Sequence, residues 1–195
     1  LLTGMLSHVN AKTNTTIVVT TLPVLKDYVK QVGREPVTVT SLISGLENGH
    51  SYALKPSDIL AVRQAHMFVT IGAGLEGWAD QVVKSAQNPS LKVLITSKGI
   101  PLLRNAGAMH TEDGKHASGN PHIWLDPLAM KKIASNIAEG LTRVDPENTA
   151  DYRARSVALG DRIDRALYGD ALVDLLGSAL LDRLVRGGQL DTYLD

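Results

Sequence analysis

The sequence has no cysteine among its 195 residues. Disulfides, zinc sites built from thiolates and catalysis by a thiol are therefore excluded within this chain. The absence of cysteine does not indicate a cellular compartment, because exported proteins need not contain disulfides.

Aromatic residues are scarce, at 4% of the chain, and 20 basic residues balance 20 acidic ones. A protein with few aromatic residues has few side chains on which bases can stack, and a protein without net positive charge does not attract phosphate. We therefore expect no nucleic-acid partner. No run approaches the roughly 20 apolar residues needed to cross a bilayer, so we do not expect the chain to span a membrane. A hydrophobic content of 44% is sufficient for a globular core.

The first 11 residues are typical of the end of a signal peptide. Residues 1–6 are mostly apolar, and Val9, Asn10 and Ala11 place small side chains before a possible cleavage site. We expect export to the periplasm, and no cysteine for a lipid anchor follows this segment. The alternative is an N-terminal end without a targeting role.

Apolar and β-branched runs alternate with stretches of helical periodicity in the first half of the chain. The expected strands are residues 17–21, 36–43, 67–71 and 92–97. The expected helices are residues 23–32, 56–65 and 76–86. This rhythm predicts an α/β fold with a parallel four-stranded sheet and helices on both faces.

The second half predicts helices. Residues 127–143 carry one apolar stripe, with Asp126 as N-cap and Pro127 in the first turn. Asp145 and Pro146 repeat this pattern before a longer helix that extends to about Tyr168. Two shorter amphipathic segments follow, at residues 171–185 and 189–195.

Ligands of parallel α/β sheets bind beyond the carboxyl ends of the strands. The loops at residues 45–55 and 72–76 each follow a predicted strand. We therefore expect these two loops to share one rim of the sheet.

Residues 72–77 match the glycine fingerprint of dinucleotide-binding proteins, but their context does not. The motif follows the third strand rather than the first, and the next strand ends in Thr96 and Ser97 without a carboxylate. Glu76 also places a negative charge where a phosphate would bind. The motif therefore predicts a tight strand-to-helix turn and not a cofactor site.

Four of the six histidines lie in predicted loops, whereas His8 falls in the N-terminal segment and His66 at a strand boundary. The four are His50, His110, His116 and His122. Neutral imidazole is the commonest protein ligand for zinc and suits other divalent transition metals. Each histidine taken singly is more often a hydrogen-bonding residue than a ligand, so the surrounding motifs have to decide.

Three segments together carry a family resemblance. They read GLENGHSYALKPSD from residue 45, GAGLEGW from residue 72 and GNPHIWLDP from residue 119. In composition, order and spacing they resemble the metal-binding solute-binding proteins of bacterial ABC importers, over residues 16–168. That family reads approximately D-P-H-x-Y-E-P-x-P-S-D, L-E-x-W and N-P-H-x-W-x-D-P at these places.

The resemblance implies that His50 and His122 are the two metal ligands of an N-terminal lobe. It implies that the remaining ligands come from a second lobe beyond one long helix. The implied organisation is a lobe at residues 12–144, an interlobe helix at 145–169, and an insertion or the start of a truncated second lobe at 170–195. Glu76 and Asp126 are expected to support the site or line its rim.

The sequence departs from the family pattern in the first motif. Asn48 and Gly49 stand in place of Asp-Pro, and Ala53 and Leu54 in place of Glu-Pro. We therefore expect a less rigid loop around His50.

The loop before the third motif carries further metal-binding side chains. They are His110, Glu112, Asp113 and His116. This stretch is either a metal-collecting loop of the kind found in zinc-binding members or a solvated loop.

The function implied by the resemblance is capture of a divalent transition metal and its delivery to an ABC-type permease. Zinc is the first expected cargo, with manganese or iron next, and the full-length protein is expected to be a monomer without enzymatic activity. Neutral imidazoles bind metal, so protons should compete with the cation. The alternatives are a metal-dependent hydrolase that uses His50, His122 and an aspartate, or a cell-surface adhesion protein with the same fold.

Overall fold

A computed structural model of the chain describes residues 15–103 and 119–188. Its four strands are β1 (Thr16–Thr20), β2 (Val37–Ser41), β3 (Met67–Thr70) and β4 (Lys92–Ile95). They pair in the order β2-β1-β3-β4, and every pairing is parallel. The predicted four-stranded parallel sheet is confirmed.

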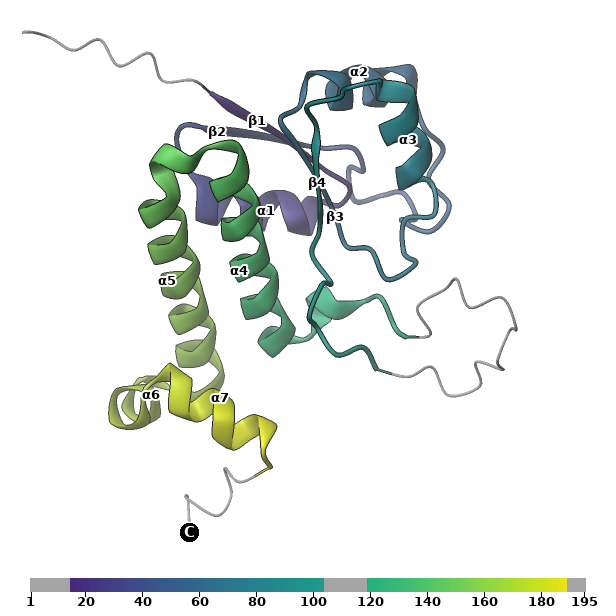
Figure 1. Cartoon of the computed structure of the whole chain (residues 1–195). Helices are drawn as coiled ribbons and strands as arrows, with labels where there is room; N and C mark the ends of the chain where they lie inside the picture. The colour runs from purple at the N-terminus through teal and green to yellow at the C-terminus, as the bar shows by residue number, and fades with distance from the viewer. Residues whose placement is uncertain (1–14, 104–118, 189–195) are drawn as a thin grey trace, which may run out of the picture.

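Seven α-helices occur in the described residues. They are α1 (Pro23–Gly33), α2 (Pro56–Gln64), α3 (Ala79–Ala86), α4 (Pro127–Val144), α5 (Thr149–Tyr168), α6 (Asp170–Leu176) and α7 (Ser178–Arg186). The helices α2 and α3 lie on one side of the sheet and α1 and α4 on the other, with α5 packed outside against α1 and α4 (Figure 1). Among the residues placed by the structure, no helix is long and apolar enough for a membrane span.

The core extends over both faces of the sheet, where the helices pack against it. The central strands β1 and β3 are almost entirely buried, as expected for a parallel sheet covered on both faces. On α4 the predicted apolar stripe is buried through Ile133, Ile137 and Leu141. Burial of this stripe removes apolar surface from water and fixes the N-terminal end of α4 near the carboxyl edge of the sheet.

The long helix α5 begins four residues later than predicted. Residues Pro146–Asn148 form a separate 3-10 turn, η2. The carboxylate of Asp145 accepts hydrogen bonds from the Asn148 amide and the Tyr152 hydroxyl instead of capping backbone amides. The first helical turn is thereby displaced to Thr149.

The helix α5 is fixed to the rest of the fold by Arg155. The guanidinium donates to the carbonyl oxygens of Val32, at 2.6 Å, and Gly33, at 3.0 Å, at the end of α1. These bonds satisfy carbonyl groups that have no partner within a helix. The helix α5 is thereby joined to the end of α1.

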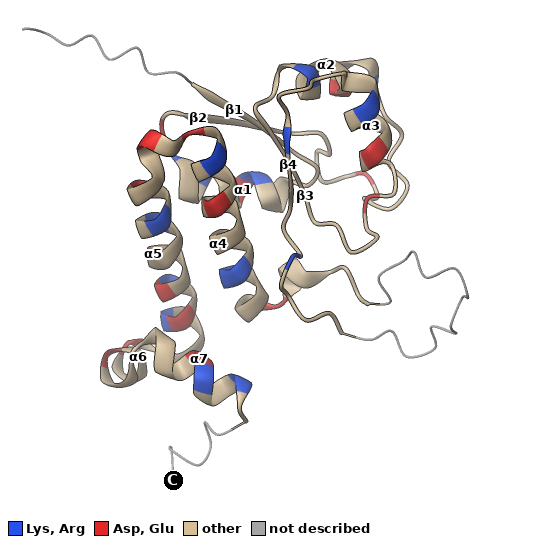
Figure 2. Cartoon of the chain, in the orientation of Figure 1, with Lys and Arg blue, Asp and Glu red and all other residues tan. Residues whose placement is uncertain are grey.

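An ionic cluster joins three helices at the far end of α5. Lys131 of α4 donates to both carboxylate oxygens of Asp164 on α5, at 2.7 and 2.8 Å, and to Asp182 on α7, at 2.7 Å. Figure 2 marks basic and acidic residues along α5, and this cluster is one of several opposite-charge contacts on the helix. The cluster differs from the others because Asp164 is fully buried.

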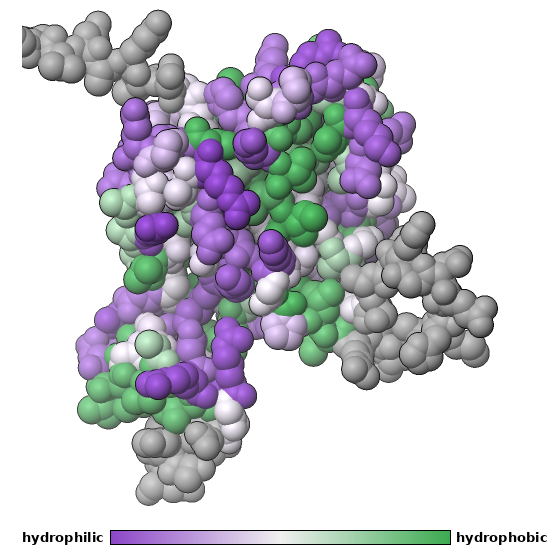
Figure 3. All heavy atoms as spheres, in the orientation of Figure 1, coloured by the Kyte–Doolittle hydropathy of each residue, from purple (hydrophilic) through white to green (hydrophobic). Residues whose placement is uncertain are grey.

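The strand β4 forms one edge of the sheet. Val93 and Ile95 on this strand are 46% and 49% exposed. Figure 3 shows apolar side chains gathered at the centre of that view, where Figure 1 places β4. The strand has four residues and begins with Lys92, features that limit edge-to-edge association of sheets.

Candidate metal centre

The two histidines singled out by the sequence lie side by side. His50 belongs to the loop after β2, and His122 directly precedes the 3-10 turn η1 (Ile123–Leu125). Their ring centroids are 5.5 Å apart, with an interplanar angle of 55°. Both residues are exposed, so their imidazoles are accessible to a solute.

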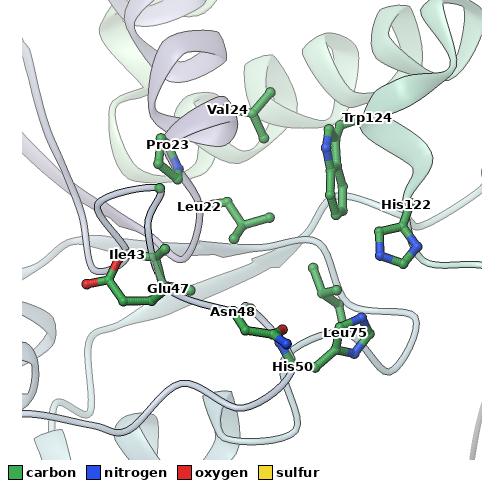
Figure 4. Close-up of a pocket in the computed structure, with 12 residues that line it drawn as sticks. Leu22, Pro23, Val24, Ile43, Glu47, Asn48, His50, Leu75, His122 and Trp124 are labelled. Carbon is green, nitrogen blue, oxygen red and sulfur yellow. The ribbon is translucent and has the colours of Figure 1, made fainter.

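The pair borders a cavity of about 300 Å³ at the carboxyl edge of the sheet. Leu22, Ile43 and Leu75 supply much of its apolar lining. Figure 4 shows the two imidazoles on one side of the cavity and Glu47 on the other. Because Leu75 and His50 line the same cavity, the expectation that the two loops share one rim is confirmed.

Both histidines follow an asparagine by two residues, and both are held by it. The Oδ1 of Asn48 accepts from the backbone N–H of His50 at 2.9 Å, and that of Asn120 accepts from the backbone N–H of His122 at 3.0 Å. The Asn120 Oδ1 also lies 2.6 Å from Nδ1 of the His122 ring. An asparagine side chain commonly forms such a turn by accepting a hydrogen bond from the backbone N–H two residues later. The Asn-x-His spacing in the sequence is therefore a signal for both turns.

The loop around His50 is anchored despite its departures from the family pattern. The indole Nε1 of Trp78 donates to the Gly49 carbonyl at 2.7 Å, so the L-E-x-W turn holds the histidine loop. The ring of Tyr52 packs against Trp78 with centroids 5.1 Å apart, and its hydroxyl donates to the buried Asp58. Residues 48 and 49 therefore lie in a loop that is held by contacts of Trp78 and Tyr52.

The sequence predicted that Glu76 begins a helix. In the structure Glu76 lies instead in the turn that precedes α3. Its carboxylate accepts from the backbone N–H groups of Ile71, at 2.8 Å, and Gly72, at 2.9 Å, and from the Thr21 hydroxyl at 2.6 Å. The side chain is 7% exposed, and α3 begins at Ala79. The carboxylate of Glu76 accepts hydrogen bonds from the backbone amides at this turn, where a phosphate would otherwise bind. This agrees with the interpretation of the glycine motif as a structural turn.

The glycine at position 72 is required by this turn. Its φ is +77°, and a Cβ there would lie 2.3 Å from Cγ2 of Ile95 on the neighbouring strand. A side chain would therefore be both strained and sterically blocked.

Replacement of Glu76 by alanine should destabilise the fold by about 2–3 kcal/mol, because it leaves buried donors without an acceptor. Urea denaturation followed by circular dichroism measures this loss. The matched variant is Thr21→Val, which removes one of the three bonds and should cost less. Equal stabilities of Glu76→Ala and the wild type would contradict this role.

Asp126 is exposed and does not line the cavity of the histidine pair. Its Oδ1 accepts from the Leu128 N–H at 2.9 Å, so it is the predicted N-cap of α4. Asp126 lines a separate hollow together with Lys132 and Arg186.

The other histidines are not part of the pair. His66 is exposed at the start of β3, where its Nδ1 accepts from the Ile17 N–H at 2.9 Å. The residues of the expected metal-collecting loop, namely His110, Glu112, Asp113 and His116, lie outside the described residues. His8 lies outside them as well.

Glu47 also lines the cavity, although the sequence motifs did not predict it. Hydrogen bonds from the Ser44 hydroxyl and backbone N–H lower the pKa of Glu47 to about 2. The carboxylate is therefore negatively charged at neutral pH and contributes negative charge opposite the imidazoles. Its neighbour Lys55, at 3.6 Å, partly balances that charge.

The geometry of the histidine pair suits a shared metal ion. Two imidazoles that bind one zinc ion at about 2.0–2.1 Å with a tetrahedral angle have ring centroids about 5.2 Å apart. The observed separation is 5.5 Å. Within residues 15–103 and 119–188, no group of three or more His, Asp or Glu side chains could hold a metal. Two imidazoles could fill at most two of the four positions around a tetrahedral ion.

Solved structures share this fold. The chain superposes on a protein described as ZnuA with a TM-score of 0.68 and 28% identity, covering 78% of this chain and 56% of that one. It also superposes on the Mn-bound periplasmic metal-binding protein from Candidatus Liberibacter asiaticus, with a TM-score of 0.65 and 23% identity. That second match covers 78% of this chain and 54% of the other, and it supports the fold alone.

Curated relatives are similar in sequence. The high-affinity zinc uptake system protein ZnuA of Bacillus subtilis is 28% identical over 145 residues, which are 71% of this chain and 45% of the relative. The manganese-binding lipoprotein MntA of Halalkalibacterium halodurans is 29% identical over 142 residues, which are 72% and 44%. The chain thus spans less than half the length of these two relatives. Their names support the solute-binding interpretation over the hydrolase and adhesion alternatives.

A family model covers most of the chain. Residues 18–167 match the model described as ZnuA, the periplasmic component A of a zinc-uptake complex. The matched region contains both loops of the histidine pair and almost all of the sheet and of α5. The chain belongs to the ZnuA family of metal-binding solute-binding proteins.

Proposed function

We propose that this chain is the metal-capturing lobe of an extracytoplasmic binding protein that delivers a divalent transition metal to an ABC-type permease. The observation that carries the proposal is the juxtaposition of His50 and His122, 5.5 Å apart at the edge of a cavity. In this proposal both imidazoles bind the metal ion directly. Glu76 acts indirectly, because it fixes the turn that carries Leu75 and Trp78.

The remaining ligands come, in this proposal, from a second lobe beyond the long helix α5. Two imidazoles leave a tetrahedral ion accessible on one side, so a second lobe can complete the shell. Ligands divided between two lobes also allow release, because a small hinge movement separates them. The protein has no need of a nucleophile or a general base for this task, which is consistent with a transport role rather than an enzymatic one.

Zinc is the first expected cargo, since imidazole is a preferred ligand of zinc and the site offers two. Manganese is the next candidate, because one relative is named as a manganese-binding lipoprotein. Iron(II) accepts the same ligands. The periplasm is the proposed compartment, in keeping with the description of the family model.

Titration calorimetry with zinc and with manganese tests metal capture. The 195-residue chain should bind zinc with a Kd weaker than about 1 µM, because two imidazoles fill only half of a tetrahedral shell. Manganese should bind more weakly still, since it prefers oxygen ligands. Zinc binding with a sub-micromolar Kd would contradict the proposed incomplete shell, and no binding of either metal would remove the proposed function.

Delivery to a permease is tested in the cell of origin. Disruption of the gene should slow growth in medium depleted of zinc by a chelator, and added zinc should restore it. Growth that responds to manganese but not to zinc would reassign the cargo. Growth equal to that of the parent strain under both limitations would contradict a role in uptake.

A further inference from the structure

The ring of His122 is held through one of its two nitrogens. Its Nδ1 lies 2.6 Å from Oδ1 of Asn120. An amide oxygen can only accept a hydrogen bond, so Nδ1 must carry the proton and the lone pair of the neutral ring lies on Nε2. The same oxygen accepts the backbone N–H of His122, and two lone pairs allow both bonds.

Asn120 is itself fixed in place. Its backbone N–H donates to the carbonyl of Leu103 at 2.7 Å, which ties the turn to the chain beyond β4. On the C-terminal side the ring of Trp124 packs against that of His122, with centroids 5.1 Å apart. The imidazole is therefore constrained by a hydrogen bond on Nδ1 and by an aromatic neighbour.

His50 provides an internal comparison. Asn48 accepts the backbone N–H of His50 at 2.9 Å, as Asn120 does for His122. Within the part of the chain that the structure describes, no hydrogen bond joins the Asn48 side chain to the His50 ring. The two turns therefore share a backbone function, and the ring contact is particular to Asn120.

We infer that Asn120 is a positioning residue that fixes His122 as the Nδ1–H tautomer and presents Nε2 to the metal. The inference rests on the proposed function for the identity of the ligand but adds a residue and a nitrogen atom to it. A neutral histidine ring without such an acceptor is free to place its proton on either nitrogen. Residues that orient a ligating histidine in this way typically change metal affinity by about 10- to 100-fold when they are replaced.

The tautomer is measured directly on the metal-free chain. Long-range ¹H–¹⁵N correlation spectra at about pH 8, where imidazoles are generally neutral, distinguish Nδ1–H from Nε2–H rings. The His122→Ala variant assigns the signal. We expect the wild-type His122 ring in the Nδ1–H form and a shift toward the Nε2–H form in Asn120→Ala. A wild-type Nε2–H ring, or a spectrum unchanged in Asn120→Ala, would overturn the inference.

Two further variants separate positioning from folding. Asn120→Asp retains an acceptor and should keep the Nδ1–H ring, so loss of that form in this variant contradicts the inference even if Asn120→Ala does not fold. Asn48→Ala should leave the tautomer of His50 unchanged. A change there equal to that in Asn120→Ala would show a general effect of the turn and overturn the specific role.

Zinc titration of the same variants gives the second result. Asn120→Ala should weaken zinc binding by about 10- to 100-fold relative to wild type, with Asn120→Asp close to wild type. A changed tautomer with unchanged zinc affinity would overturn the positioning role. If the wild type bound no zinc, the proposed function would fail, but the spectra would still decide whether Asn120 orients the ring.

Discussion

The His122→Ala variant should lose zinc binding by a factor on the order of 100 or more. Residues that only orient a ligating histidine already change affinity by about 10- to 100-fold, and removal of a ligand should cost at least as much. The chain offers no replacement near the pair, since no third His, Asp or Glu joins it within the described residues. Titration calorimetry on the wild type and the variant measures the change.

His66→Ala is the matched control for that experiment. His66 is also an exposed histidine, but it lies at the start of β3 and bonds to the Ile17 N–H. Its replacement should leave zinc binding unchanged. The His50→Ala variant should behave like His122→Ala, and the double variant should lose little more, because one remaining imidazole makes no chelate. Zinc binding that survives both single replacements would place the metal elsewhere and contradict the assigned pair.

The sheet could be predicted because parallel strands have a strong local signature. β1 and β3 are short, apolar and β-branched, and each is followed by a helix with clear periodicity. The order β2-β1-β3-β4 also places the loops after β1, β2 and β3 at one edge, so a shared rim follows from topology. The proximity of His50 and His122 could be predicted because the motifs around them are specific, although the two residues lie far apart in sequence.

The predicted helix starts were wrong where an acidic side chain bonds other partners than the first amides of the helix. Glu76 has the position of a helix-initiating carboxylate, but Thr21 and two backbone amides draw it into the turn. Asp145 likewise bonds Asn148 and Tyr152 rather than capping α5. Local propensity predicts that a helix begins close to these residues, but it does not determine which residue is the first of the helix.

Asn120 shows a different limit of the sequence. The Asn-x-His spacing occurs twice and predicts the backbone turn in both places. In the second turn the His122 ring also brings its Nδ1 to the amide oxygen. The orientation of a side chain depends on its surroundings, which here include the ring of Trp124, so the spacing alone does not predict this contact.

The Lys131→Met variant should be less stable than the wild type by about 3–5 kcal/mol, the usual cost of leaving one partner of a buried ion pair alone. Asp164 is 0% exposed, and in the structure Lys131 bonds both of its oxygens. Burial alone would lower the pKa of Lys131, but hydrogen bonds to Asp164 and Asp182 raise it overall, so the lysine is charged at neutral pH. Methionine keeps much of the side-chain volume and removes only the cation. Urea denaturation measures the loss.

Two comparisons decide whether the loss comes from the stranded charge. In the double variant Lys131→Met and Asp164→Leu no fully buried charge remains, since the Asp182 side chain is 29% exposed, so most of the stability should return. The control variant is Arg165→Met, because Arg165 contacts the carboxylates of Asp161, Asp170 and Asp174 at the surface. Exposed pairs contribute little, so the stability lost in Arg165→Met should be much smaller, although Arg165 has three acidic partners and Lys131 has two. Losses of equal size in Lys131→Met and Arg165→Met would contradict the role of burial. If the double variant stayed as unstable as Lys131→Met, the cluster would act by joining α7 to α4 and α5 rather than by neutralising Asp164.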